Sequence, residues 1–149
     1  MKDIYNDAVI VPLVEAADLA HTDTQSKYVD LAGFEACEIV VAIGALTGVD
    51  ASNYLTPTLQ EASTTPGTVG NYAAVDSTNI IGGFSKVDAT TKDSVVQRAC
   101  YTGSKRYVNV LLDYTGTAIT AGIVGVYAIL RRARKGPESA ITPTTGAVA

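Results

Sequence analysis

Alternation of apolar and polar residues in the last third of the chain is the feature that most constrains its fold. Successive side chains of a β-strand point to opposite faces, so a period of two lets one set face a core. Between positions 107 and 114 the inward set would be Val108, Val110, Leu112 and Tyr114, and the outward set Tyr107, Asn109, Leu111 and Asp113. The same period recurs at Leu55, Pro57 and Leu59. Because proline has no N–H to donate, Pro57 predicts an edge strand or a bulge.

Two further runs, residues 39–46 and 123–130, are apolar on both faces of the expected strand. Many of their residues are β-branched, among them Val40, Val41, Val124 and Val126, which favours strand over helix. We therefore expect both runs to form central strands.

Shorter candidate strands cover residues 9–14, 28–31, 72–75, 80–84 and 94–101, and segments rich in glycine, proline and threonine separate many of them. About nine short strands at intervals near 8–12 residues are typical of a sandwich or barrel. The sequence therefore predicts an all-β domain, an antiparallel β-sandwich with a jelly-roll-like topology. Helix is expected only at residues 14–20, where alanine and leucine favour two helical turns.

The chain changes character after Lys135. Residues 1–135 are predicted to form the β-sandwich domain, and residues 136–149 an extended C-terminal arm. The arm has no hydrophobic periodicity, and Pro137 and Pro143 disfavour helix while lowering the entropy lost when an extended segment is immobilised. We expect such an arm to cross a neighbouring subunit and to gain backbone hydrogen bonds there.

A basic cluster lies at the root of this arm. It holds four of the eleven Lys and Arg residues: Arg131, Arg132, Arg134 and Lys135. One interpretation is a solvated strand end, and the other is an anchor on the carboxylates of a partner. Together with Pro137 and Pro143, these residues are the predicted partner-binding residues.

Composition narrows the class of partner. Charged residues make up 17% of the chain, against about 25% in an average globular domain. The chain is therefore either compact or partly covered by a partner. A net charge of -4 provides no basic field for nucleic acid, so no specific nucleic-acid binding is expected. No signal peptide is recognisable, and the most apolar stretch, residues 119–130, is shorter than the roughly 20 residues of a membrane-spanning helix, so no membrane association is expected.

Catalytic chemistry has little support in the residues. His21 lies in a polar segment beside Asp23, and a surface histidine is favoured over the base of a Ser-His-Asp arrangement. Cys37 and Cys100 fit no disulfide framework, zinc motif or redox motif, and are expected to be buried free thiols. We therefore predict that the chain is not an enzyme and has no catalytic residues, no metal and no cofactor.

Two other patterns have ordinary explanations. The Gly103-Ser104-Lys105 tripeptide has the lysine and the hydroxyl in the wrong order for a phosphate-binding loop, and a β-hairpin turn is expected instead. The scattered carboxylates are expected to be solvated loop charges rather than a glycosidase pair: Asp76, Asp88, Asp93 and Asp113.

Five short segments carry a resemblance to a known family. They are FEACEIVV at 34–41, LQE at 59–61, YAAV at 72–75, IIG at 80–82 and the most distinctive, YTGSKRYV at 101–108. In this order, over about two-thirds of the chain, they resemble a family of small structural proteins of tailed phages and prophages that are commonly encoded with head genes. The resemblance implies a virion component and carries over no catalytic residue.

We therefore expect a non-enzymatic virion protein, assembled in the host cytoplasm. It would be a homo-oligomeric capsid decoration or cement protein that binds the major capsid protein or another virion protein. Jelly rolls are frequent in viral capsids, and a capsid multiplies each weak contact across its lattice. Two alternatives stay open: a head–tail or tail structural subunit, and a carbohydrate-binding module for host attachment. Exposed tyrosines in a concave surface would favour the carbohydrate-binding module, whereas flat apolar patches would favour the structural roles.

Overall fold

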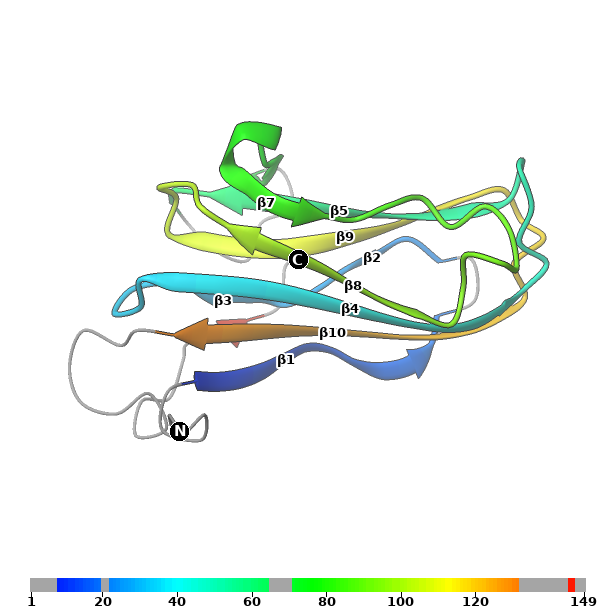
Figure 1. Cartoon of the computed structure of the whole chain (residues 1–149), viewed down its shortest axis with the longest axis horizontal. Helices are drawn as coiled ribbons and strands as arrows, with labels where there is room; N and C mark the ends of the chain where they lie inside the picture. Colours follow the sequence, from blue (N-terminus) through cyan, green and yellow to red (C-terminus); the bar gives the residue numbers. More distant parts are fainter. Residues whose placement is uncertain (1–7, 20–21, 65–70, 132–144, 147–149) are drawn as a thin grey trace.

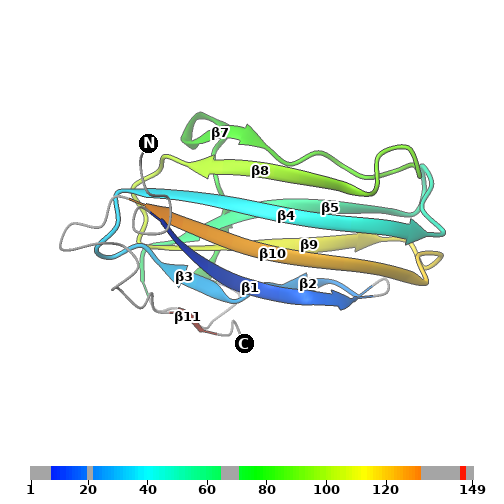
Figure 2. The ribbon, with the colours of Figure 1, turned by 60° about the horizontal axis from the view of Figure 1, so that its bottom comes forward.

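Two antiparallel sheets stack face to face in the computed structural model, which describes residues 8–19, 22–64, 71–131 and 145–146 (Figures 1 and 2). The five-stranded sheet has the order β1 (Ala8–Asp18), β10 (Ala121–Arg131), β4 (Ala36–Thr47), β8 (Val95–Tyr101), β7 (Ile80–Gly83). The six-stranded sheet has the order β11 (Thr145–Gly146), β3 (Tyr28–Asp30), β9 (Tyr107–Thr115), β5 (Tyr54–Ala62), β6 (Ala73–Ala74), and β2 (Thr24–Gln25) also pairs with β9. The predicted antiparallel β-sandwich is confirmed.

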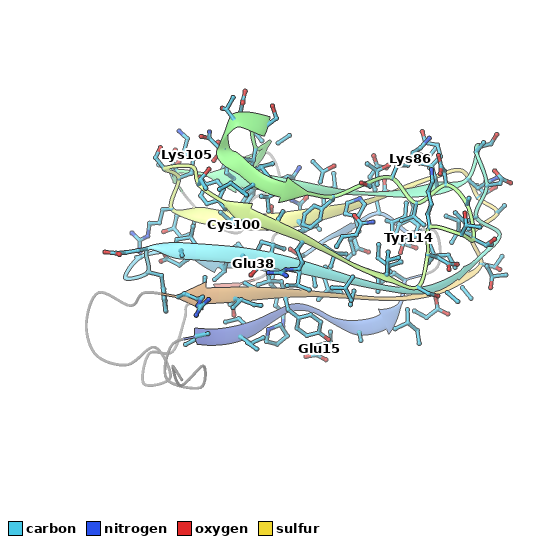
Figure 3. All side chains as sticks on the ribbon, in the orientation of Figure 1. Glu15, Glu38, Lys86, Cys100, Lys105 and Tyr114 are labelled. Atoms are coloured by element: carbon cyan, nitrogen blue, oxygen red, sulfur yellow. The ribbon has the colours of Figure 1, made fainter. Side chains whose placement is uncertain are left out.

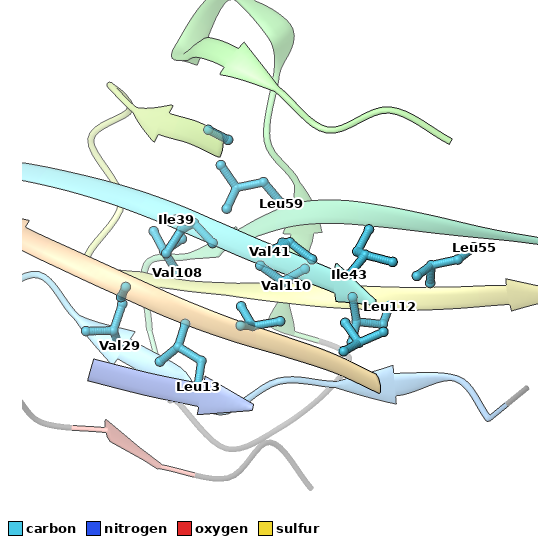
Figure 4. Packing of buried hydrophobic residues seen from close by; sticks show 14 of the residues in the cluster. Leu13, Val29, Ile39, Val41, Ile43, Leu55, Leu59, Val108, Val110 and Leu112 are labelled. Atoms are coloured by element: carbon cyan, nitrogen blue, oxygen red, sulfur yellow. The ribbon is translucent and has the colours of Figure 1, made fainter. Parts of the chain in front are cut away.

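The core lies between the two sheets and uses the predicted alternation. On β9, Val108, Val110 and Leu112 are fully buried, and Ile39 and Val41 of β4 meet them from the opposite sheet (Figure 4). Both runs that are apolar on two faces form central strands, because β10 lies between β1 and β4, and β4 lies between β10 and β8. These predictions are confirmed.

The helix expected at residues 14–20 is wrong as far as the structure describes this segment. Strand β1 continues to Asp18, with Val14 paired to Val126 and Ala17 paired to Val124 of β10. Helix propensity is a weak preference, and pairing with a long neighbouring strand overrides it here. Two register irregularities, between Pro12 and Val14 and between Val14 and Ala17, mark where the pairing adapts.

Pro57 was predicted to mark an edge strand or a bulge, but β5 lies between β9 and β6 and its pairing with β9 has no bulge. Because β6 pairs only with Gln60 and Glu61, no strand pairs with Pro57 on the side away from β9. The backbone N–H of Leu55 donates to Val87 on the side away from β9, and the carbonyl of Leu59 accepts from Val75 on that same side. Pro57 lies between these two bonds, so its missing N–H faces a gap in the pairing. The proline therefore removes no hydrogen bond from the β5–β9 ladder.

The hairpin turn expected at Gly103-Ser104-Lys105 is wrong. Strand β8 belongs to the five-stranded sheet and β9 to the other, so this connection crosses between the sheets. Side-chain hydrogen bonds fix this connection, where a hairpin would have backbone hydrogen bonds between its strands. The hydroxyl of Tyr101 accepts from the Lys105 N–H at 2.8 Å and donates to the Glu61 carboxylate. A turn signal in sequence marks a reversal of the chain but does not say which sheet the next strand joins.

A candidate assembly interface on the five-stranded sheet

The outer face of the five-stranded sheet is unusually apolar for a surface that points away from the core. Strand register sets its rows, because residues that pair across strands share a face. One row across the sheet consists of Ile10, Ile129, Glu38, Cys100 and Ile81. The next row consists of Pro12, Tyr127, Val40, Arg98 and Gly83. We call this surface the outer face.

Four large hydrophobic side chains stand out from this face. Ile10 is 66% exposed, Ile81 68%, Val96 64% and Ile123 59%, and among the described residues these are all of the large hydrophobic side chains that are exposed. Single exposed apolar side chains are common on proteins, but a contiguous apolar patch usually marks an interaction site. Their gathering on one face of one sheet is therefore informative.

Small residues and one tyrosine keep the centre of the outer face flat. Ala42 and Gly125 are paired across β4 and β10. A Cβ built on Gly125 would lie only 3.1 Å from the ring of Tyr127, so the glycine leaves room for that ring to lie along the sheet. Tyr127 thus adds a half-buried aromatic surface, of the kind enriched at protein interfaces.

One ion pair interrupts the apolar surface. Arg98 of β8 donates from Nε to the Glu38 carboxylate of β4, close to Cys100 (Figure 3 labels Glu38 and Cys100). The side chain of Arg98 is 67% exposed and that of Glu38 is 23% exposed. The hydrogen bond and the charge of Glu38 raise the pKa of Arg98. The two opposite charges lie side by side, so their net charge is zero, but the pair presents a negative end and a positive end on the outer face.

The edges of this sheet are poor sites for adding another strand. At one edge, β1 carries Pro12 and two register irregularities. At the other, β7 has only 4 residues, with Gly82 and Gly83 at φ of 84° and 141°. Bulges, proline and short length are the features that protect sheet edges from pairing. The contact surface offered by this sheet is therefore its face.

The two cysteines face opposite sides of the same sheet. Cys37 pairs with Tyr101 and points into the core, whereas Cys100 pairs with Glu38 and lies on the outer face. Both thiols are free. Burial, with smaller effects of Cys100 and Glu38, raises the pKa of Cys37 to about 12. The prediction of a buried thiol is confirmed for Cys37 and wrong for Cys100, which is half-buried.

A cavity of about 540 Å³ opens at one end of the sandwich, where the segment between β3 and β4 meets the segment between β8 and β9. Phe34, Cys37 and Tyr101 form part of its lining, and Glu35 and Lys105 reach it from the two segments. The raised pKa keeps the Cys37 thiol protonated at neutral pH, and a thiol is a weak nucleophile in that form. The cavity therefore offers charged and apolar contacts rather than an activated nucleophile.

The cavity wall is fixed by an ion pair. Arg106 donates to Asp30 from Nε at 2.9 Å and from Nη2 at 2.7 Å, and the Ala32 N–H donates to the same carboxylate at 2.8 Å. Burial raises the pKa of Asp30, but the bonds from Arg106 and Ala32 outweigh burial, so its pKa lies below the usual value. This pair fastens β3 to the distinctive segment at 101–108.

Three of the scattered carboxylates have structural partners, and the fourth, Asp113, lies within strand β9 and not in a loop as expected. Asp76 caps a short 3₁₀ turn at Ser77–Asn79, Asp93 accepts from the Leu46 N–H at 2.8 Å, and Asp88 pairs with two lysines. Those pairs lower the pKa of Asp88 to about 2. Among the described residues no group of three or more metal-ligating side chains comes together, and no helix is long and apolar enough to span a membrane.

The predicted partner-binding residues lie almost entirely outside the described residues: Arg132, Arg134, Lys135, Pro137 and Pro143. Arg131 is described, and it ends β10 as an exposed residue paired with Ala8 and Ala36. Of the C-terminal arm, only Thr145–Gly146 is described, and this segment pairs with β3. His21 also lies outside the described residues.

The apolar outer face was not predicted from the sequence, although the sequence contains a pattern that indicates it. An antiparallel sheet with one solvated face should alternate polar and apolar residues, whereas runs 39–46 and 123–130 are apolar at both sets of positions. This pattern predicted their central position in the sheet and equally indicated an apolar outer surface. No family model, curated protein or solved structure matches this chain.

Proposed function

We propose that this chain is a non-enzymatic structural protein of a tailed-phage virion, most specifically a decoration or cement protein of the head. The observation that carries the proposal is the apolar outer face of the five-stranded sheet. A face that exposes Ile10, Ile81, Val96 and Ile123 together is suited to permanent contact with protein rather than with water.

The strand pairing supports a jelly-roll topology, which we include in the proposal. If β2 and β3 count as one strand, the first strand pairs with β10 and the second with β9. Moving inward along the chain, β4 pairs with β8 and β5 pairs with β6. This is the pairing of one long hairpin wound around a core, with its rungs alternating between two sheets. Viral capsid and lectin domains use jelly rolls.

In this role the chain would act through repeated weak contacts. Each subunit would contribute its outer face, and the basic cluster at Arg131, Arg132, Arg134 and Lys135 would contact carboxylates of the major capsid protein or another virion protein. A lattice repeats these contacts, so modest single affinities sum to stable attachment. Within the arm at residues 136–149, Thr145–Gly146 pairs with β3 of the same chain, and the rest of the arm would contact a neighbouring subunit.

The carbohydrate-binding alternative gains less support. Tyrosine rings that bind sugars must be accessible, yet each of the seven tyrosines at described positions is half-buried or buried. Tyr28 and Tyr107 pack edge to face at 5.6 Å, and burial together with these two neighbours raises the pKa of Tyr72 to about 12. The flat apolar face favours a structural role, either in the head or as the alternative head–tail or tail subunit.

The test is a binding assay on purified particles that lack the native copy of this chain. We expect the full chain to occupy them, and we expect deletion of residues 136–149 to lower occupancy while the isolated domain stays folded and loses only the short pairing of Thr145–Gly146 with β3. Salt should weaken attachment because the basic cluster acts through charge. Failure of the full chain to bind such particles would contradict the proposal.

A further inference from the structure

We propose that the outer face binds a second copy of this chain, face to face around a two-fold axis that lies in the plane of the interface and bisects the line from Glu38 to Arg98. The resulting dimer would be the unit that enters the assembly. The inference deepens the proposed structural role and rests on it for its purpose, but it has a test of its own.

The size of the face suits a dimer. Its strands have 11, 11, 12, 7 and 4 residues. Each residue of a sheet covers about 16 Å² at a rise of about 3.4 Å and a strand spacing of about 4.8 Å, so the face measures roughly 700 Å². A standard stable interface buries about 800 Å² per partner. Complete overlap of two such faces would reach nearly the area that a specific dimer needs, and an axis at Glu38, the third residue of β4, covers part of it.

The charge pattern is complementary to itself. In a two-fold interface, if residue i of one copy contacts residue j of the other, then j also contacts i. An axis that crosses the Glu38–Arg98 line at its midpoint and at right angles places Glu38 of each copy opposite Arg98 of the other. The intramolecular pair becomes a four-membered network of alternating charge. Arg131, at the end of β10, and the exposed Glu15 of β1 are further charged residues of this sheet, one of each sign. A face of one sign would instead repel its own copy.

The shape also favours a second sheet as the occupant. Two sheets pack face to face about 10 Å apart, with their strands either nearly aligned or crossed near a right angle. Glu38 and Arg98 lie diagonally across β4 and β8, because Glu38 pairs with Cys100 and Arg98 with Val40, so an axis that exchanges them gives the crossed arrangement. The small residues Ala42 and Gly125 let the opposed sheet approach at the centre, and Val96 and Ile123 project beside them. A second copy supplies a sheet with the same twist, and it covers its own exposed isoleucines and valines in the same contact.

Oligomeric state is the first measurement, by sedimentation equilibrium of the full chain over about 1–100 µM. We expect dimers of wild type and monomers of Val96→Glu, with the dissociation constant raised at least about a hundredfold by a charge buried in an apolar contact. Ala73→Glu is the matched control, since Ala73 is an exposed strand residue of the other sheet. Ile10→Lys serves as a second disrupting variant if Val96→Glu does not fold by circular dichroism.

Charge exchange tests the two-fold arrangement itself. E38R alone would place Arg against Arg98 of the partner, and R98E alone would place Glu against Glu38, so each variant should be monomeric. A mixture of the two should form a heterodimer, because every facing pair is again opposite in sign. Differently tagged copies and native mass spectrometry would detect it.

Three results would overturn the inference: a monomeric wild type across the series, dimers that survive both Val96→Glu and Ile10→Lys, or single-charge variants whose mixture stays monomeric. Particle binding separates these outcomes from the proposed function. A monomeric wild type that still occupies particles, and loses occupancy with Val96→Glu, would mean that the outer face meets another virion protein. The dimer would then be wrong and the structural role would stand.

Discussion

Asn109 should be a source of instability that a single substitution removes. The residue lies on the outward set of β9 but is fully buried, and neither its amide oxygen nor its amide nitrogen has a hydrogen-bond partner. An unpaired buried polar group costs about 1–3 kcal/mol. Asn109→Leu nearly conserves the volume, removes both groups and adds apolar contact with its neighbours. We expect it to raise the free energy of unfolding by about 2 kcal/mol.

The assay is urea and thermal unfolding followed by circular dichroism. For a domain of this size 1 kcal/mol corresponds to about 2–4 °C, so the melting temperature should rise by about 4–8 °C. The control is Asn53→Leu, because the Asn53 amide donates to Asp50 and accepts from the N–H groups of Thr117 and Ala118. That variant should be destabilised. A loss of stability in Asn109→Leu would refute the reasoning and show that this amide is paired in solution.

Three further outcomes follow from the same structure. Arg106→Gln should lower the melting temperature at pH 7. Because the pKa of Asp30 is depressed in the folded state, the difference in melting temperature from wild type should shrink as the pH falls below 3.8 and vanish below the folded pKa. A difference that is constant with pH would contradict this. The monomeric Val96→Glu variant treated with a maleimide at pH 7.5 should be modified at Cys100 and not at Cys37, the wild-type dimer should protect Cys100, and both thiols should be modified in urea, as peptide mass spectrometry would show. Ile39→Ala should cost about 2–5 kcal/mol in urea unfolding, since Ile39 is fully buried between the sheets, and a cost below about 1 kcal/mol would place it outside the core.

Local pattern was enough to predict the fold class and most of the strands. The alternation at Val108, Val110 and Leu112 belongs to a single strand, so burial of this face could be predicted without knowing which sheet packs against it. Pro57 indicated an unpaired stretch on one side of its strand for the same reason, because a missing N–H is a property of the residue itself. These predictions succeeded because each rests on chemistry within a few residues.

Predictions that depended on distant partners fared worse. The segment that includes Ala17 has helix-forming residues, but β10 offered it a pairing partner more than a hundred positions away along the chain. The connection at Gly103 looked like a hairpin because sequence does not reveal that β8 and β9 belong to different sheets. The outer face was likewise hidden, since Ile10, Ile81 and Val96 come together only through strand order.

Cryo-electron microscopy of purified particles tests the central claim most directly. If the chain is a structural protein held in the virion through its outer face, the reconstruction should show its sandwich at regular lattice positions, with Val96 and Ile123 covered by protein. Particles that contain no copy of this chain, or copies whose five-stranded sheet faces open solvent throughout, would contradict the account.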